Sequence, residues 1–155
     1  NIYFDRSEDY GRSWMEVDKV ITVQPGGWDQ KIPGLGRANG LPITLCDLSE
    51  GPNRGTIYVN WSDQRAGNTD TDIWMASSRD SGTTWSEPVK VKNEDSRHHQ
   101  FLPWAAVDQT TGYLYVVFYD RRNFDDQSTE VYLATSKDGG KTFTNEKISE
   151  RSFIL

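Results

Sequence analysis

The stretch Ser78-Arg79-Asp80-Ser81-Gly82-Thr83-Thr84-Trp85 decides the fold, because the chain contains it in three versions. The other two copies run from Ser7 to Trp14 and from Ser136 to Phe143. All three keep Ser, Asp, Gly, a hydroxyl residue and an aromatic residue at the same internal spacing. Chance rarely produces such agreement in 155 residues, so the sequence indicates internal repetition.

The chemistry of the octapeptide predicts a tight turn. The Asp side chain accepts hydrogen bonds from backbone N–H groups just ahead of it, and Gly adopts the positive φ that a reversal needs. The Ser or Thr hydroxyl adds local hydrogen bonds, and the aromatic ring packs back onto the flanking strands. The structural residues of these octapeptide turns are Asp9, Gly11, Trp14, Asp80, Gly82, Trp85, Asp138, Gly140 and Phe143.

The residues before the second and third copies also align with one another. Gly55 to Arg65 matches Gly112 to Arg122, and Asp72 to Ser78 matches Glu130 to Ser136. Each aligned unit contains four segments that are typical of strands, separated by turn signals. The expected strands are residues 43–46, 56–62, 72–77 and 86–92 in one unit, and 104–107, 113–119, 130–135 and 144–149 in the next.

The pattern predicts an all-β fold, because β-branched and aromatic residues dominate these segments and no run shows a helical period. Four antiparallel strands per repeat are typical of a β-propeller blade. We divide residues 1–155, as part of one propeller domain, into a half blade (1–23) and two blades (41–92 and 101–149). A propeller ring needs roughly four to eight blades, so we expect the same or another chain to complete it.

The octapeptide turn resembles the Asp box, or BNR repeat, of the sialidase-like (neuraminidase) β-propellers. The blade alignment extends this resemblance to nearly the whole chain. Within that family the box is a structural turn away from the active site, so it implies an architecture rather than an activity. The resemblance also implies a secreted or cell-surface protein.

Strand order places the candidate functional residues at one end of the blades. Antiparallel strands send alternate loops to opposite ends, so the octapeptide turns occupy one end, which we call the turn end. The loops between second and third strands and the blade connectors occupy the other, the loop end. The polar and aromatic residues expected at the loop end are Trp28, Asp29, Arg37, Asp63, Arg65, Asn68, Asp70, Asp72, Arg97, His98, His99, Asp120, Arg121, Arg122, Asp125 and Asp126.

Such a mixture suits a glycan or a small anionic sugar. Guanidinium groups pair bidentately with carboxylates, Trp rings stack on sugars, and carboxyl groups supply the acid and base of glycoside hydrolysis. Trp28, Asp63, Arg121 and Arg122 are therefore candidate substrate-binding residues. On the sialidase resemblance, Arg65 binds the substrate carboxylate and Asp70 is the proton donor.

Two observations favour a structural, non-catalytic role as an alternative to sugar binding and catalysis. The Asp-x-Arg arrangement of Asp63 and Arg65 recurs at Asp120 and Arg122, which indicates an architectural ion pair. The sialidase signature Arg-Ile-Pro is replaced by Leu41-Pro42 and by Leu102-Pro103, so the first Arg of the carboxylate-binding triad is missing here. The sequence thus supports a carbohydrate-active propeller, an exo-sialidase-type glycosidase or a glycan-binding module. The alternative is a non-catalytic scaffold or protein-binding component of a surface assembly.

Composition excludes several other classes. The formal net charge of -6 and the lack of any basic run argue against a nucleic-acid surface, and no stretch approaches the apolar length of a membrane span. The single cysteine, Cys46, excludes an internal disulfide, and its apolar neighbours predict a small core residue. We expect no metal and no cofactor, since His98 and His99 lack partners at zinc spacing. The segment 68–72 lacks the Gly and distal Glu of an EF-hand and is interpreted as a solvated acidic loop.

Overall fold

The computed structural model describes all of residues 1–155, which form eleven strands and no helix. The all-β expectation is confirmed. No segment forms a helix that is long and apolar enough to cross a membrane. The strands are β1 (Ile2–Phe4), β2 (Lys19–Thr22), β3 (Ile43–Cys46), β4 (Ile57–Asp63), β5 (Asp72–Ser78), β6 (Val89–Lys90), β7 (Gln100–Val107), β8 (Leu114–Asp120), β9 (Ser128–Ser136), β10 (Thr144–Lys147) and β11 (Phe153–Ile154).

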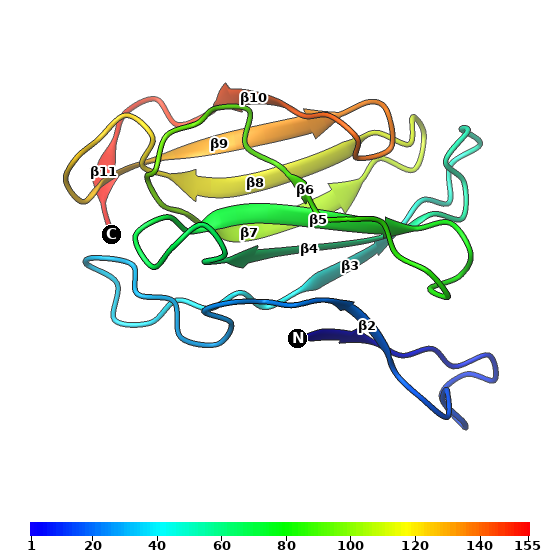
Figure 1. Ribbon diagram of the computed structural model, residues 1–155. Coiled ribbons are helices and arrows are strands. Elements are labelled where there is room, and N and C mark those ends of the chain that lie inside the picture. Colours follow the sequence, from blue (N-terminus) through cyan, green and yellow to red (C-terminus); the bar gives the residue numbers. More distant parts are fainter.

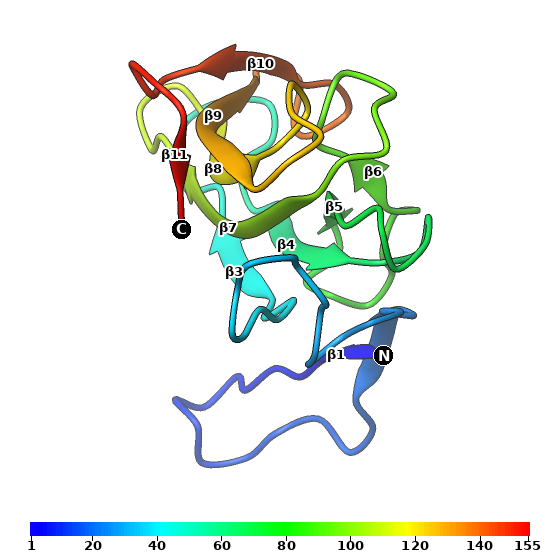
Figure 2. The ribbon, with the colours of Figure 1, turned by 90° about the vertical axis from the view of Figure 1, so that its left-hand side faces the viewer.

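The strands form three antiparallel sheets that follow the chain order. The first sheet is β1-β2, the middle sheet is β3-β4-β5-β6, and the third is β7-β8-β9-β10, with β11 added to β9. Figures 1 and 2 show the three sheets stacked side by side, with the middle sheet between the other two. The registers repeat as well, because Asp63 pairs with Asp72 in the middle sheet and Asp120 pairs with Glu130 in the third. The sheets are therefore arranged as successive blades.

Burial along the strands follows from this stacking. Strand β4 is buried at six successive positions, because the middle sheet is covered on both faces. Strand β8 alternates between buried and half-buried positions, because only one face of the third sheet is covered. The same sequence unit thus has two burial patterns, and its place in the stack decides between them.

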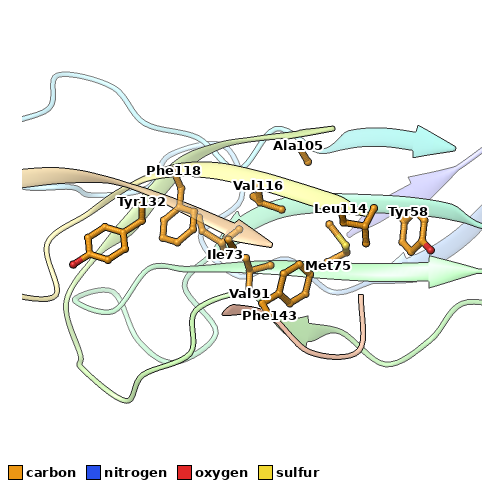
Figure 3. Close-up of a cluster of buried hydrophobic side chains, with 11 residues drawn as sticks. Tyr58, Ile73, Met75, Val91, Ala105, Leu114, Val116, Phe118, Tyr132 and Phe143 are labelled. Carbon is orange, nitrogen blue, oxygen red and sulfur yellow. The ribbon is translucent and has the colours of Figure 1, made fainter. Parts of the chain in front are cut away.

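Apolar side chains from neighbouring sheets form the core. The largest cluster joins Ile73, Met75 and Val91 of the middle unit to Val116 and Phe118 of the third sheet (Figure 3). A second cluster packs Ile2 of the first sheet against Val59, Trp61 and Ala76 of the middle sheet. Fully burying one such side chain stabilises the fold by about 1.5–3 kcal/mol, so the blades stabilise one another.

The octapeptide turns share one hydrogen-bond pattern, and Figure 1 shows all three at the same end of the sheets, on the right. The Asp carboxylate accepts the backbone N–H and the hydroxyl of the residue four positions later, at 2.6–3.0 Å. The Ser hydroxyl accepts the N–H of the Gly, whose φ is +80° to +85°. The residues joined in this way are Asp9 with Ser13, Asp80 with Thr84, and Asp138 with Thr142.

The turn aromatics differ in burial, because those of the second and third turns pack on the preceding sheet. Phe143 joins the cluster between the middle and third sheets. Trp85 meets Phe4 of the first sheet edge-on, with ring centroids 5.2 Å apart. Trp14, in the first turn, is 61% exposed.

Three sequence-based expectations about the strands and Cys46 need correction. Strand β6 covers only Val89–Lys90 and begins directly after Pro88, which cannot donate a ladder hydrogen bond. Strand β7 begins at Gln100 rather than at residue 104, and a register shift with Leu102 at φ +50° carries the chain across Leu102-Pro103. Cys46 is exposed and not a core residue, because in β3 its neighbour Leu45 faces the core.

Candidate functional site

The loop end of the sheets gathers the polar residues of the two second-to-third-strand loops and of the connectors. Figure 1 shows these segments on the left, opposite the octapeptide turns. Asp63 and Asp120 end β4 and β8 at this end, while Ser78 and Ser136 open the turns at the other. The expected separation into a turn end and a loop end is therefore present.

Each loop begins with an Asp-x-Arg ion pair in which the Arg side chain is bound to the Asp of the same loop. Arg65 donates from Nε to both oxygens of Asp63 at 3.0 Å, and from Nη2 to Oδ2 at 2.6 Å. Arg122 donates from Nε to Asp120 Oδ2 at 2.7 Å, and its Nη2 lies 2.6 Å from the same oxygen. Both aspartates are almost fully buried. In both loops the Asp therefore fixes the Arg side chain.

Aromatic rings complete these pairs. The Arg65 guanidinium lies 4.3 Å from the ring centroid of Trp74, and that of Arg122 lies 4.1 Å from Tyr132. Trp61 also donates its indole N–H to Asp63 at 2.8 Å. This geometry favours the bracing role over the substrate-binding role for Arg65 and Arg122.

The residue between Asp and Arg is Gln64 in one loop and Arg121 in the other. The backbone N–H of each donates to a carbonyl of the preceding connector. The N–H of Gln64 donates to Pro25 O, and the N–H of Arg121 donates to His99 O. Both side chains also donate to a buried threonine at 3.0 Å, Gln64 to Thr71 and Arg121 to Thr129. Arg121 therefore places a charge where the other blade has a neutral amide.

Arg121 has no ion-pair partner despite its burial. The residue is 3% exposed, and its Nη1 donates to the Pro33 carbonyl at 2.8 Å. Its guanidinium lies 5.2 Å from the Phe101 ring centroid. Burial lowers the pKa of Arg121, and Asp126, outside ion-pair distance, is the carboxylate that opposes this shift. A buried cation without a paired carboxylate is uncommon in folded proteins.

A cavity of about 550 Å³ adjoins Arg121 at the loop end. His99 in its wall contacts Thr71 Oγ1 through Nδ1 at 3.0 Å. Burial, followed by the charges of Arg121 and His98, lowers the pKa of His99 to about 4, so His99 is neutral at pH 7. The lining residues are Pro33, Thr69, Arg97, His98, His99, Arg121, Phe124, Asp125, Asp126, Gln127 and Ile154.

Asp70 lies in a buried ionic cluster outside this cavity. Its Oδ1 is 3.7 Å from Lys92 Nζ, and Lys92 lies 2.8 Å from Asp72. Burial, followed by the charge of Asp72, raises the pKa of Asp70, although Lys92 opposes the shift. The interpretation of segment 68–72 as a solvated loop holds for Asn68 and Thr69, which are exposed. It is wrong for residues 70–72, which are buried, and Lys90 and Lys92 pair with the two aspartates. No group of three or more His, Cys, Asp or Glu side chains is arranged to hold a metal ion.

The structure thus separates the candidates that the sequence grouped. Arg121 lines the loop-end cavity, whereas Trp28 lines a different hollow with Tyr3 and Leu41. The roles of Lys92 and Thr129 were missed at the sequence level. The Gln64-to-Arg121 difference in the aligned repeats was the available signal for the unpaired cation.

Comparison with known families agrees with this architecture. A family model described as a BNR repeat-like domain matches residues 55–154. The chain belongs to the BNR repeat-like family. The expectation of a sialidase-like, BNR-repeat β-propeller is confirmed. No curated protein matches the sequence of this BNR repeat-like chain.

Solved structures share the fold of this BNR repeat-like chain. A mutant of an α-L-arabinofuranosidase from Fusarium graminearum, in complex with an iminosugar inhibitor, is 18% identical with a TM-score of 0.63; the match covers 97% of this chain and 41% of that one. A protein of unknown function from Dyadobacter fermentans DSM 18053 is 25% identical with a TM-score of 0.52; the match covers 96% and 38%. The chain therefore spans about two fifths of the length of these structures.

Proposed function

We propose that this chain is part of a carbohydrate-active β-propeller whose loop end binds an anionic sugar through Arg121. Membership of the BNR repeat-like family and the fold shared with an α-L-arabinofuranosidase support a sugar as the ligand. The remaining blades, from the same or another chain, pack on the free face of the third sheet. That face carries half-buried Val117 and Tyr119 and 67%-exposed Trp104.

The single observation that carries this proposal is the unpaired guanidinium of Arg121. Burying an unpaired cation is costly, and a ligand carboxylate would remove that cost by forming a charge-assisted hydrogen bond. Two of the guanidinium nitrogens already bind Thr129 and Pro33, which fixes the orientation of the group. Nη2 is left to donate to the ligand.

The cavity is large enough for a sugar acid and holds a suitable set of partners. Arg97 adds a second cation, and the neutral imidazole of His99 contributes hydrogen bonding without charge. Asp125 and Asp126 supply carboxylates that can accept sugar hydroxyls. We assign the ligand class as a terminal sugar carrying a carboxylate, which includes the sialosides.

Arg121→Gln tests the proposal with the residue that the preceding blade uses at this position. The full-length protein is titrated by calorimetry with N-acetylneuraminic acid and with its methyl ester. We expect wild type to prefer the acid and Arg121→Gln to lose roughly tenfold or more of its affinity, because a charge-assisted bond is worth about 1.5–3 kcal/mol. Arg151→Gln, at an exposed site, is the control. Equal affinity for acid and ester would contradict the proposal.

The proposed sugar site could serve binding without turnover or hydrolysis of the bound sugar. Binding without turnover is the function that the geometry supports. It is favoured because Arg65 and Arg122 are held by aspartates and Asp70 is held by Lys92, away from the cavity. In the hydrolytic alternative, Asp70 is the proton donor, and its raised pKa supports that role. The enzyme is supported if the protein hydrolyses a fluorogenic sialoside and Asp70→Asn loses this hydrolysis but still binds the sugar. Binding without any hydrolysis would decide for the module.

A further inference from the structure

A second cavity, of about 410 Å³, lies at the turn end, opposite the proposed sugar site. It lies between the outer part of the middle sheet and the third octapeptide turn. Tyr58, Met75 and Trp85 line one side, and the backbone of Gly139 and Gly140 lines the other. The cavity therefore belongs to the contact between two blades.

Close packing of the neighbouring turns shapes this cavity. Asn53 accepts a hydrogen bond from Arg79 Nη2 at 2.6 Å and also packs against Gly139, so it connects the second and third turns. A Cβ atom at Gly140 would come within 3.3 Å of Leu114 and 3.4 Å of Met75. Glycine at these two positions, both with positive φ, keeps side-chain atoms out of the space.

The lining combines an apolar floor with cations and no acid. Met75, Val89 and Trp85 supply apolar and aromatic surface, and exposed Arg79 and Lys141 supply positive charge. No aspartate or glutamate lines the cavity, although the chain carries a net charge of -6. The local charge is thus opposite to that of the whole chain, which favours an anionic ligand.

Two buried hydrogen-bonding groups in this wall have no partner within the protein. They are the hydroxyl of Tyr58, a residue with 0% exposure, and the indole N–H of Trp85. Figure 3 shows the Tyr58 ring at the end of the core cluster, beside Met75 and Leu114, with its hydroxyl at the outer end of the ring. Neither atom is accessible from the cavity, so this wall offers a ligand apolar and aromatic surface rather than these two donors.

We propose that the turn-end cavity binds a small aromatic carboxylate. The ring of the ligand lies on Met75 and Val89, and its carboxylate reaches Lys141 and Arg79 at the rim. This site is independent of the proposed sugar site, because the two lie at opposite ends of the sheets and share no residue.

The test is a titration of the full-length protein with 2-naphthoate, followed by ligand-observed saturation-transfer NMR and calorimetry. We expect saturable binding, and weaker binding of the neutral analogue 2-naphthalenemethanol. Lys141→Gln should weaken 2-naphthoate binding about two- to fivefold, as expected for loss of one partly exposed charge pair. Arg12→Gln is the matched control, because Arg12 occupies the same turn position as Lys141 and does not line the cavity.

A second variant tests the location. Val89→Trp should fill the cavity and abolish 2-naphthoate binding, while circular dichroism and affinity for N-acetylneuraminic acid report whether the protein is folded. If Val89→Trp fails to fold, the difference in 2-naphthoate affinity between Lys141→Gln and Arg12→Gln still tests the location of the site. Absence of saturable binding, equal binding of the neutral analogue, or equal loss in Arg12→Gln would overturn the proposal.

Discussion

The aspartates of the octapeptide turns are stabilised as anions by the turn itself. A backbone hydrogen bond from Ser13 is the largest effect on Asp9, and the side chain of Thr84 is the largest on Asp80; each pKa is lowered to about 2. Burial raises the pKa of Asp138, but hydrogen bonds from Thr142 and Ser136 outweigh it and also give about 2. Each turn is therefore more stable with its aspartate ionised than with its aspartate protonated.

These shifts predict acid sensitivity of the fold. The folded pKa of about 2 lies below the ordinary value of 3.8, so the carboxylates contribute stability that is fully present above about pH 4. This contribution is lost as the pH falls from about 4 to about 2. Thermal unfolding measured across this range should show the melting temperature falling, and Asp80→Asn should make that fall shallower. Asp95→Asn, at an exposed position, is the control; an equal change there would contradict this account.

At the residue scale the sequence predicted the turn chemistry better than the site chemistry. The turn bonds connect residues at most four apart, so spacing alone determines them. The partners of Arg121 come from other segments, since Pro33 lies 88 residues away. Whether Arg121 is paired or unpaired depends on that packing, which the repeat pattern does not contain.

The second and third octapeptide turns also act as contacts between blades. Gly82 lies directly under the ring of Phe4 of the first sheet, and a Cβ atom at this position would overlap the ring. The residue has φ +85°, which disfavours any side chain. The glycine is thus required both by the turn and by the neighbouring sheet.

Gly82→Ala should therefore destabilise the protein by more than backbone strain alone. Gly55→Ala is the matched control, because Gly55 has φ +82° and no atom within 4 Å of the added Cβ. We expect the control to lose about 1–2 kcal/mol from the left-handed conformation and Gly82→Ala to lose about 1–3 kcal/mol more from overpacking. Urea unfolding measures both. Equal losses would show that the Phe4 contact is unimportant.

At the scale of elements, prediction worked where the pattern was local. The second and third strands of both units lie within two residues of their expected ranges, because their alternation and β-branched content are strong. Strand β3 has its expected bounds and β10 ends two residues early, whereas the bounds of β6 and β7 differ more from expectation. Their bounds depend on Pro88 and on the irregular backbone at Leu102-Pro103, where the ladder is interrupted for conformational reasons.

At the scale of the molecule, the stacking of sheets explains which cavities exist. Both proposed sites lie where two blades meet, one at the loop end and one at the turn end. The sequence predicted which loops share an end, because antiparallel order fixes it. It did not predict the cavities, because they depend on how side chains of two separate units fit together.

The shared core predicts that the middle and third sheets unfold as one unit. Val116 and Val117 test this, because they are adjacent and of the same type but face opposite sides of β8. Val116 is fully buried against the middle sheet, whereas Val117 is half-buried on the free face. Val116→Ala should cost about 1.5–3 kcal/mol and Val117→Ala less than about 1 kcal/mol.

Hydrogen exchange measured on the same two variants locates the effect. In Val116→Ala, the amides of β4 and β5 should lose as much protection as those of β8 and β9, because one cooperative opening exposes both sheets. Val117→Ala should leave protection in β4 and β5 nearly unchanged. Loss confined to β7–β10 in Val116→Ala would mean that the blades open separately, and the cluster in Figure 3 would then not couple them.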